Sequence, residues 1–393
     1  MKHRKIIHLD LDAFFCAVEE LKDPSLAGKA FAVGGAANGR GVISTCSYEA
    51  RKYGIRSAMP TAKALKLFPD LLLLHGSYGE YSGHSKKVMK IVREYTPKVQ
   101  QISVDEAFMD ISDLARGGTE IANEIQRKIQ AQVGLPCSFG IATNKLIAKI
   151  ATDHGKSMQK GHDYPRSILE VPPGEERMFL APMDVRSLWG IGPKTSERLH
   201  GMGIHTLGDL AALSTAQAEK LFGKYGMELV QRARGEDDSE VYEGGEAKSV
   251  SQETTFGKDQ DNPELLRKVL LEQSAQVGRQ LRKQRQMGSV VRIKIRWPDF
   301  STYTRQMKVE VTSNDDDIFT AALKLLESVW DGTKKIRLIG VGVSGLQGET
   351  HQLNLFDRSD EKDRQMLTVL DELKAKFGEE IIHKGNVKSR RRF

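Results

Sequence analysis

The stretch Ser103-Val104-Asp105-Glu106-Ala107 places two adjacent carboxylates directly after a β-rich segment at residues 98–102. A third carboxylate, Asp10, closes another predicted strand at residues 5–9. Carboxylates that converge from strand ends supply the oxygen ligands that Mg²⁺ prefers, together with substrate phosphates. Two such ions about 4 Å apart can activate an attacking oxygen and stabilise a leaving one. Acidic pairs are also common on solvated surfaces, so the rest of the chain has to decide between a metal site and a surface loop.

Strands and helices alternate around these carboxylates in the order βαββαβ. The apolar spacing predicts strands at 6–9, 98–102, 107–111 and 137–141, and helices at 14–21, 79–95, 119–132 and 144–154. Residues 22–75 interrupt this order with a unit that contains several glycines and prolines, a predicted strand at 41–45 and a short helix at 48–53. The pattern predicts a ferredoxin-like sheet layer with an inserted unit.

The second half of the chain divides at two breaks. Val171-Pro172-Pro173-Gly174 precedes a helical segment at 175–235, and an acidic, glycine-bearing linker follows it. A second βαββαβ pattern then has predicted strands at 249–256, 290–297, 302–311 and 336–344, and helices at 262–287 and 315–330. A polar tail with one predicted helix, 361–377, and a basic end completes the chain. The fold class is therefore α+β and multidomain.

The composition is that of an ordinary globular protein. The chain has 393 residues, of which 39% are hydrophobic and 28% charged, and two to four domains are expected. A net charge of +7 favours a polyanionic partner. Cys16, Cys46 and Cys137 stand far apart, which predicts neither a zinc site nor a disulfide framework and fits a reducing cytoplasm. Asp10 and Asp12 interrupt the amino-terminal apolar run, so we expect no signal peptide, and no stretch is long enough to cross a membrane. We also expect a monomer.

A glycine-rich turn at residues 188–195 has the form of a helix-hairpin-helix. Gly190 and Gly192 let the backbone approach a ligand closely, and Pro193 suits the first turn of a helix. The N–H groups of such a turn, with Lys194 beside them, can hold a DNA phosphate without reading any base. The alternative is a plain turn between two helices.

Residues 279–308 are strongly basic. They contain nine Lys or Arg residues and a single acid, Asp299. Arg292, Lys294 and Arg296 alternate with apolar residues, which predicts a strand with its cations on one face. Such a face is a plausible platform for a phosphate backbone, although it could also be simply solvated.

Four side chains could meet a nucleoside triphosphate. Tyr48 and Arg51 lie three residues apart on one short predicted helix, so both can point into one cleft, where Arg51 could fork onto phosphates. Lys156, after the helix at 144–154, could contact phosphates as a point charge. Phe15 is close enough to Asp10 in sequence to crowd a sugar 2′-hydroxyl. Each of these residues could equally be an ordinary surface or core residue.

The tail contains a short apolar motif just past the last predicted domain. Gln352, Leu353, Leu355 and Phe356 form a segment typical of peptides that dock in a partner's pocket. The alternative is that this segment packs back on its own chain.

With these residues in hand, the chain resembles the Y-family DNA polymerases of the bacterial translesion type, over about residues 3–356. The resemblance is carried by residues 8–15, 41–60, 103–107 and 188–195. It implies a palm at 1–165 with fingers inserted at about 16–76, a thumb at 166–235, a linker at 236–247, a little finger at 248–348 with a second ferredoxin-like pattern, and a tail at 349–393.

The resemblance also implies roles for individual residues. Asp10, Asp105 and Glu106, assisted by the Leu11 carbonyl, would hold two Mg²⁺ ions, for which Mn²⁺ can substitute. Phe15 falls on the family's steric-gate position, and Thr45, Tyr48, Arg51 and Lys156 fall on or near its triphosphate-binding positions. Residues 352–356 are similar to the peptide that holds the sliding clamp. The family copies damaged templates with low fidelity and low processivity, and it lacks a proofreading exonuclease.

The chain departs from the family pattern at residues 156–161. The family usually has Lys-Pro-x-Gly there, so Lys160 is a rival to Lys156 for the phosphate role. Two other functions remain open. A nucleotidyl cyclase could use a similar carboxylate-bearing sheet, and a non-catalytic protein could bind DNA and the clamp.

Overall fold

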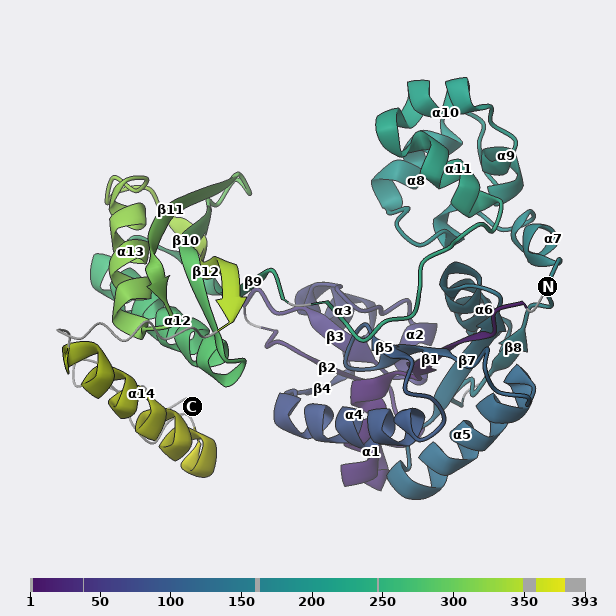
Figure 1. Cartoon of the computed structure of the whole chain (residues 1–393), viewed down its shortest axis with the longest axis horizontal. Coiled ribbons are helices and arrows are strands. Elements are labelled where there is room, and N and C mark those ends of the chain that lie inside the picture. The colour runs from purple at the N-terminus through teal and green to yellow at the C-terminus, as the bar shows by residue number, and fades with distance from the viewer. Residues whose placement is uncertain (1–2, 38, 160–162, 246, 349–357, 379–393) are drawn as a thin grey trace. The chain divides into compact units, whose positions relative to one another are not determined.

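The computed structural model describes residues 3–37, 39–159, 163–245, 247–348 and 358–378 (Figure 1). The chain forms two compact units, Met1–Gly245 and Glu246–Phe393, and each is described by itself.

A five-stranded sheet lies at the centre of the first unit, in the order β5-β6-β1-β7-β8. The first four strands have the order of a ferredoxin-like fold, as predicted. β8 extends the sheet parallel to β7, so the sheet continues past residue 165, where the family resemblance implied the end of the palm. The strands are β1 (Ile6–Leu11), β5 (Val99–Gln101), β6 (Glu106–Asp110), β7 (Cys137–Ala142) and β8 (Ile168–Glu170).

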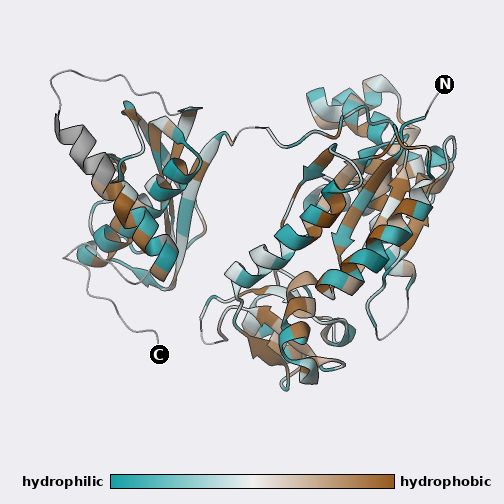
Figure 2. Ribbon diagram, turned by 60° about the horizontal axis from the view of Figure 1, so that its bottom comes forward, coloured by the Kyte–Doolittle hydropathy of each residue, from teal (hydrophilic) through white to brown (hydrophobic). Residues whose placement is uncertain are grey.

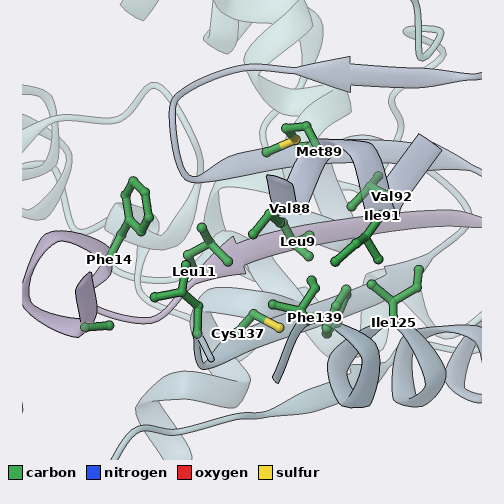
Figure 3. Close-up of a cluster of buried hydrophobic side chains, with 14 of the residues drawn as sticks. Leu9, Leu11, Phe14, Val88, Met89, Ile91, Val92, Ile125, Cys137 and Phe139 are labelled. Atoms are coloured by element: carbon green, nitrogen blue, oxygen red, sulfur yellow. The ribbon is translucent and has the colours of Figure 1, made fainter. Parts of the chain in front are cut away.

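The alternation along β1 divides its side chains between two cores. Ile7, Leu9 and Leu11 belong to one core with the helices α4 and α5, part of which Figure 3 shows. Ile6 belongs to the other core, with α6, and His8 and Asp10 share its side of the strand. The helices are α1 (Phe14–Lys22), α4 (Tyr78–Arg93), α5 (Gly118–Val133) and α6 (Lys145–Met158).

The inserted unit has a sheet of its own, in the order β3-β2-β4. The sequence pattern predicted β3 and α2 but not β2 and β4. Its small core contains Ala32, Ile43 and Ile55. The elements are η1 (Pro24–Leu26), β2 (Phe31–Gly34), β3 (Ile43–Cys46), α2 (Tyr48–Lys52), α3 (Thr61–Leu67) and β4 (Leu72–Leu74).

The helical segment after β8 shares a core with α6. Leu180, Val185, Leu188 and Leu199 are buried with Ile147 of α6. The elements are α7 (Glu176–Leu180), η2 (Val185–Ser187), α8 (Pro193–His200), α9 (Leu207–Ala211), α10 (Thr215–Phe222), η3 (Gly223–Tyr225) and α11 (Gly226–Ala233).

Much of the predicted linker is docked on the amino-terminal end of α6. The Asn144 side chain donates to the Gly235 carbonyl at 2.8 Å, and Lys145 Nζ donates to the Glu240 carbonyl at 2.8 Å. The Leu146 N–H donates to Asp237 Oδ2 at 3.0 Å. One acidic side chain of the predicted linker, Asp237, thus accepts from the first turn of a helix, where negative groups are stabilising, and the other two contacts are made by backbone carbonyls.

The second unit has the predicted βαββαβ order, but its strand order is β11-β10-β12-β9. The second and fourth strands are central here, whereas the first and third are central in the first unit. The helices α12 and α13 share a core with one face of the sheet (Figure 1). Figure 2 shows both hydrophobic and hydrophilic residues on the strands of this unit. The elements are β9 (Ser249–Gln260), α12 (Pro263–Lys283), β10 (Gln286–Arg296), β11 (Thr302–Thr312), α13 (Asp315–Glu327) and β12 (Ile336–Gly348).

The tail contains the predicted helix, α14 (Arg358–Phe377), which is docked on this unit. Leu367 is buried, and Asp371 accepts from Arg282 Nε at 2.7 Å. Arg282 also pairs with Asp315 at 2.8 Å, so one guanidinium joins α12, α13 and α14. The predicted docking peptide at 352–356 lies outside the described residues.

All three cysteines, Cys16, Cys46 and Cys137, are buried as free thiols. Burial raises the pKa of each thiol above its ordinary value. In the described parts of the chain, no helix has the length and apolar character needed to cross a membrane.

Candidate active site

The register of β1 against β6 brings two of the predicted carboxylates together. Asp10 is the cross-strand partner of Glu106. The Leu11 N–H donates to the Asp105 carbonyl at 3.0 Å, which fixes the residue before β6 beside the end of β1. The chain then leaves the sheet through Ala13, whose φ of 42° lies in the left-handed region that is rare for a residue with a side chain.

A cavity of about 310 Å³ opens at this end of the sheet. It combines residues from β1, α1, the inserted unit and α6. Eight of its lining residues were singled out in the sequence, namely Asp10, Leu11, Phe15, Thr45, Tyr48, Arg51, Asp105 and Lys156. Ser44, Ser57 and Asp153 also line it and were not predicted.

Lys156 neutralises the carboxylates on the β1 side of the cavity. Its ammonium donates to Asp10 Oδ1 and lies 3.1 Å from Asp12 Oδ1. Burial raises the pKa of Asp10 to about 7, because the opposing effect of Lys156 is smaller and Glu106 and Asp105 add repulsion. Burial lowers the pKa of Lys156, but the two carboxylates together raise it above its ordinary value.

Asp12 is fully buried and acts as the anchor of this arrangement. Its oxygens accept from Ser138 Oγ at 2.8 and 3.0 Å and from the Arg166 N–H at 3.0 Å. These donors fix the Asp12 side chain in place, and its 3.1 Å contact with Lys156 Nζ holds that lysine beside Asp10.

Glu106 is bound by Lys149 and lies near His8 on the same side of the sheet. Lys149 Nζ donates to Glu106 Oε2 at 2.8 Å, and His8 Nε2 lies 3.8 Å from the same oxygen, beyond hydrogen-bonding distance. Burial raises the pKa of Glu106, but His8 and Lys149 outweigh burial and hold it below its ordinary value. Burial lowers the pKa of His8, which favours the neutral ring.

The donor set suits a hard divalent cation. Among the residues that the structure describes, no group of three His, Cys, Asp or Glu side chains is arranged to hold one metal ion. Lysine ammonium groups instead contact Asp10 and Glu106, and Ser103 Oγ contacts Asp105. Asp10 and Glu106 are each paired with a lysine ammonium group, and the Leu11 backbone lies beside them. These carboxylates therefore supply the negative charge and the oxygen donors that Mg²⁺ requires.

Phe15 forms one wall of the cavity from the first turn of α1. Its ring stacks on Tyr81 with centroids 4.2 Å apart and meets Tyr78 edge-on at 5.8 Å. Phe14, its neighbour, is buried in the core. Phe14 also lines the cavity, so both adjacent aromatic residues border it.

Tyr48 and Arg51 face the cavity from α2, as their spacing predicted. Ser47 begins this helix by accepting from the Ala50 N–H at 3.2 Å. The Arg51 guanidinium lies over the Tyr48 ring at 4.3 Å from its centroid, a cation–π contact that fixes its direction. Burial raises the pKa of Tyr48 to about 12, so its hydroxyl remains a hydrogen-bond donor.

One face of α6 carries three residues of the site. Lys149, Asp153 and Lys156 are spaced four and three apart, which places them on one side of a helix. Only Lys156 was predicted, although this spacing could have revealed the other two. Lys160, the rival to Lys156, lies outside the described residues.

The predicted hairpin turn lies before α8 in the helical segment. Gly190 has a φ of 102°, which requires glycine, and Gly192 is the residue before the first turn of α8, with Pro193 following. The Trp189 carbonyl accepts from Arg232 at 2.7 Å, and the Trp189 ring lies 6.0 Å from Lys149 Nζ. The turn is thus next to the residue that binds Glu106.

The alternation along β10 is as predicted. Val291, Ile293 and Ile295 are buried, whereas Arg292, Lys294 and Arg296 are partly exposed on the opposite face. The basic run at 279–308 is not one surface, however. Its first four cations belong to α12 and the turn after it, and Arg282 is used internally by Asp315 and Asp371.

Three family models match the chain. The model described as the impB/mucB/samB family matches residues 9–153, and its C-terminal domain model matches residues 247–355. The model described as the IMS family HHH motif matches residues 173–204, which include the hairpin turn.

The chain is similar to curated and solved proteins over most of its length. DNA polymerase IV of Desulfatibacillum aliphaticivorans is 40% identical over 96% of this chain and 95% of that protein. DNA polymerase IV of Dehalococcoides mccartyi strain CBDB1 is 38% identical over 98% of both. A chimeric Y-family DNA polymerase of Dbh and Dpo4 has a TM-score of 0.75 at 24% identity, covering 86% of this chain and 98% of that one, and DinB from Sulfolobus solfataricus has a TM-score of 0.60 over the same shares. The chain therefore belongs to the impB/mucB/samB family of Y-family DNA polymerases.

Proposed function

We propose that this protein is a DNA-directed DNA polymerase that carries out translesion synthesis, with low fidelity, low processivity and no proofreading. The observation that carries the proposal is the register of Asp10 against Glu106, with Asp105 in the same cavity as Phe15, Tyr48 and Arg51. Relatives named DNA polymerase IV support the same conclusion.

The residues that would hold the metal ions are Asp10, Asp105 and Glu106, with the Leu11 carbonyl. Two Mg²⁺ ions, or Mn²⁺ in their place, would activate the primer 3′-oxygen and neutralise charge on the leaving pyrophosphate. Lys156 is then available to turn from Asp10 toward a triphosphate, because it lines the same cavity. Lys149 keeps the Glu106 carboxylate charged and directed by its 2.8 Å contact.

The incoming dNTP would be bound by the inserted unit and screened by Phe15. Arg51 supplies a planar guanidinium suited to phosphate oxygens, and Tyr48 supplies a hydroxyl that keeps its proton. Thr45 lines the same wall. The Phe15 ring is held between Tyr78 and Tyr81, so it resists displacement by a ribose 2′-hydroxyl.

Primer-template DNA would be held outside the cavity. The backbone N–H groups at Gly190 and Gly192, with Lys194, would bind phosphates, as would Arg292, Lys294 and Arg296. Residues 352–356 would dock on the sliding clamp. We expect the protein to act as a monomer in the cytoplasm.

A primer-extension gel tests the proposal against both alternatives. Primed template, dNTPs and Mg²⁺ should give stepwise primer growth past a template lesion. A nucleotidyl cyclase would instead convert free triphosphate to a cyclic product without primer growth, and an accessory protein would produce neither. Absence of primer growth at any DNA concentration would refute the proposed activity.

The clamp-docking segment is tested separately. Deletion of residues 352–356 should leave basal extension unchanged and abolish its stimulation by a sliding clamp. Stimulation that survives the deletion would contradict the docking role.

A further inference from the structure

Two glycines leave a bare stretch in the middle of the polar face of the second unit's sheet. Gly340 and Gly342 of β12 lie between β10 and β9, and both pair with cationic residues of β10. Lys294 pairs with Gly340 and Arg292 with Gly342. On the other side, Gly340 pairs with Glu253 of β9. Because glycine has no side chain, residues on the strands to either side can reach across β12.

Lys294 and Glu253 form an ion pair across this bare strand. Lys294 Nζ donates to both carboxylate oxygens of Glu253 at 2.9 Å. A Cβ at Gly340 would lie 2.7 Å from Glu253 Cγ and 3.0 Å from the Gln252 carbonyl oxygen, so any larger residue would displace the carboxylate. The pairing of β10 with β9 residues through a third strand therefore depends on Gly340.

A hollow of about 250 Å³ lies over the two glycines. Arg292, Lys294, Glu253 and Thr304 line it with side chains, and β12 forms its floor. Two cations and one anion face the same small space. The helices α12 and α13 occupy the opposite side of the sheet, so this face is the one that they leave uncovered (Figure 1).

We propose that this hollow receives a phosphodiester group of bound DNA, and that Glu253 competes with that group for Lys294. The inference rests on the proposed function, because it takes DNA as the ligand. A phosphate oxygen and the Glu253 carboxylate are alternative partners for the same ammonium. The side chains of the pair are about one-third exposed, at 32% for Lys294 and 37% for Glu253, so solvent weakens the pair and a polyanion can displace it.

Glu253 thereby lowers the affinity of the sheet for DNA. Each phosphate that a protein neutralises contributes about −0.9 to the slope of log affinity against log salt. An internal carboxylate that already neutralises Lys294 removes much of that contribution. Glu253 would therefore weaken DNA binding at this position of the sheet. Weaker binding favours release of the DNA after a short stretch of synthesis.

The test measures binding of the full-length protein to a primed DNA duplex between about 0.05 and 0.2 M salt. Glu253→Gln keeps the shape of the side chain and removes its charge. The matched control is Glu327→Gln, at an exposed position on α13, which changes the net charge equally but lies on the helical side of the sheet. A third variant, Lys294→Gln, and the double variant Glu253→Gln with Lys294→Gln complete a double-mutant cycle. The cycle measures whether the effect of Glu253 on DNA binding depends on Lys294.

We expect Glu253→Gln to tighten DNA binding roughly threefold to tenfold and to steepen the salt slope by about 0.9, with a much smaller change for Glu327→Gln. The gain should be largely lost in the Lys294→Gln background. Equal gains from the two glutamate variants, or a gain that persists without Lys294, would overturn the proposal.

A competition arm separates DNA from free phosphate as the source of the oxyanion. Inorganic phosphate and chloride, matched for ionic strength, should weaken DNA binding by the Glu253→Gln variant equally. If inorganic phosphate, but not chloride, removed the tighter DNA binding of the Glu253→Gln variant, the hollow would bind a free anion instead of DNA. Primer extension by the wild-type protein decides the proposed function separately, because the binding cycle does not require catalysis.

Discussion

The two large sheets of this protein share the element order βαββαβ but differ in strand order. In the first unit β1 and β6 are neighbours, and in the second unit β12 lies between β10 and β9. The first arrangement places Asp10 beside Glu106, nearly a hundred residues apart in sequence. The second places bare glycine between Lys294 and Glu253. Two sheets with the same order of elements along the chain therefore bring different side chains together. What decides which side chains meet is the order of the strands across the sheet.

The two sheets also differ in the burial of their charged side chains. The carboxylates of the first sheet are largely buried, and lysines from α6 offset them. The charged residues of the second sheet are partly exposed, where ion pairs contribute little to stability. Substitutions in the first sheet should thus alter chemistry, whereas those on the polar face of the second should alter binding.

The largest expected effect is a loss of catalysis on substitution of a carboxylate in the first unit. Asp105→Asn should reduce primer extension by about a thousandfold or more, because charge neutralisation and positioning supply most of the rate in nucleotidyl transfer. The measurement is single-turnover dNTP insertion at saturating DNA. Asp113→Asn, at an exposed site beyond the same strand, is the control and should insert at nearly the normal rate. A near-normal rate for Asp105→Asn would remove the metal assignment.

The second effect concerns the buried face of the other sheet. Ile293→Ala should lower the free energy of unfolding of the second unit by about 3 kcal/mol, because it opens a cavity beneath α12 and α13. Denaturant unfolding measures this change. Arg292→Ala, on the neighbouring position of the strand, should cost much less, and comparable losses would contradict the division of β10 into a core face and a polar face.

The third effect tests the wall of the catalytic cavity. Phe15→Ala should raise the rate of ribonucleotide insertion relative to deoxyribonucleotide insertion by roughly tenfold to a hundredfold, since a hydroxyl then fits where the ring stood. Paired kinetics with dNTP and rNTP measure the ratio. Tyr78→Ala, which removes an exposed neighbour of Phe15, should change the ratio less. An unchanged ratio for Phe15→Ala would exclude the gate.

The smallest effect belongs to the polar face. Arg292→Gln should weaken DNA binding a few-fold and reduce the salt slope by about one, uniformly across sequences. Insertion at saturating DNA should change far less than in Asp105→Asn, and fluorescence anisotropy at several salt concentrations gives the slope. A slope equal to that of the wild-type protein would show that this face does not contact phosphates.

Much of the fold could be predicted from the sequence because its long elements have clear periods. β1 and β7 are rich in apolar residues, and β10 alternates strictly from Val291 to Arg296. The strands β2, β4 and β8, of three or four residues each, were missed, although β3 and β5 are equally short and were predicted. The docked segment at 235–243 was missed because two of its contacts with the start of α6 are made by the backbone carbonyls of Gly235 and Glu240, which composition does not reveal.

The candidate site divides in the same way. Residues next to strand ends or on short helices, such as Asp10 and Arg51, could be singled out from local spacing. Lys149 and Asp153 were missed, although their spacing of four and three residues places them on the same helix face as Lys156. The pair of Lys294 and Glu253 depends on the strand order of the second sheet, which the element order leaves undetermined.

The burial of Cys16, Cys46 and Cys137 has a practical consequence. Thiols with raised pKa values inside the core react slowly with maleimides, because the thiolate is the reactive form and the reagent cannot reach it. A single cysteine introduced on an exposed helix would therefore be labelled selectively in the wild-type background. Pairs of dyes placed in this way, one in each unit, could report by energy transfer how the polymerase closes on DNA during a single binding event.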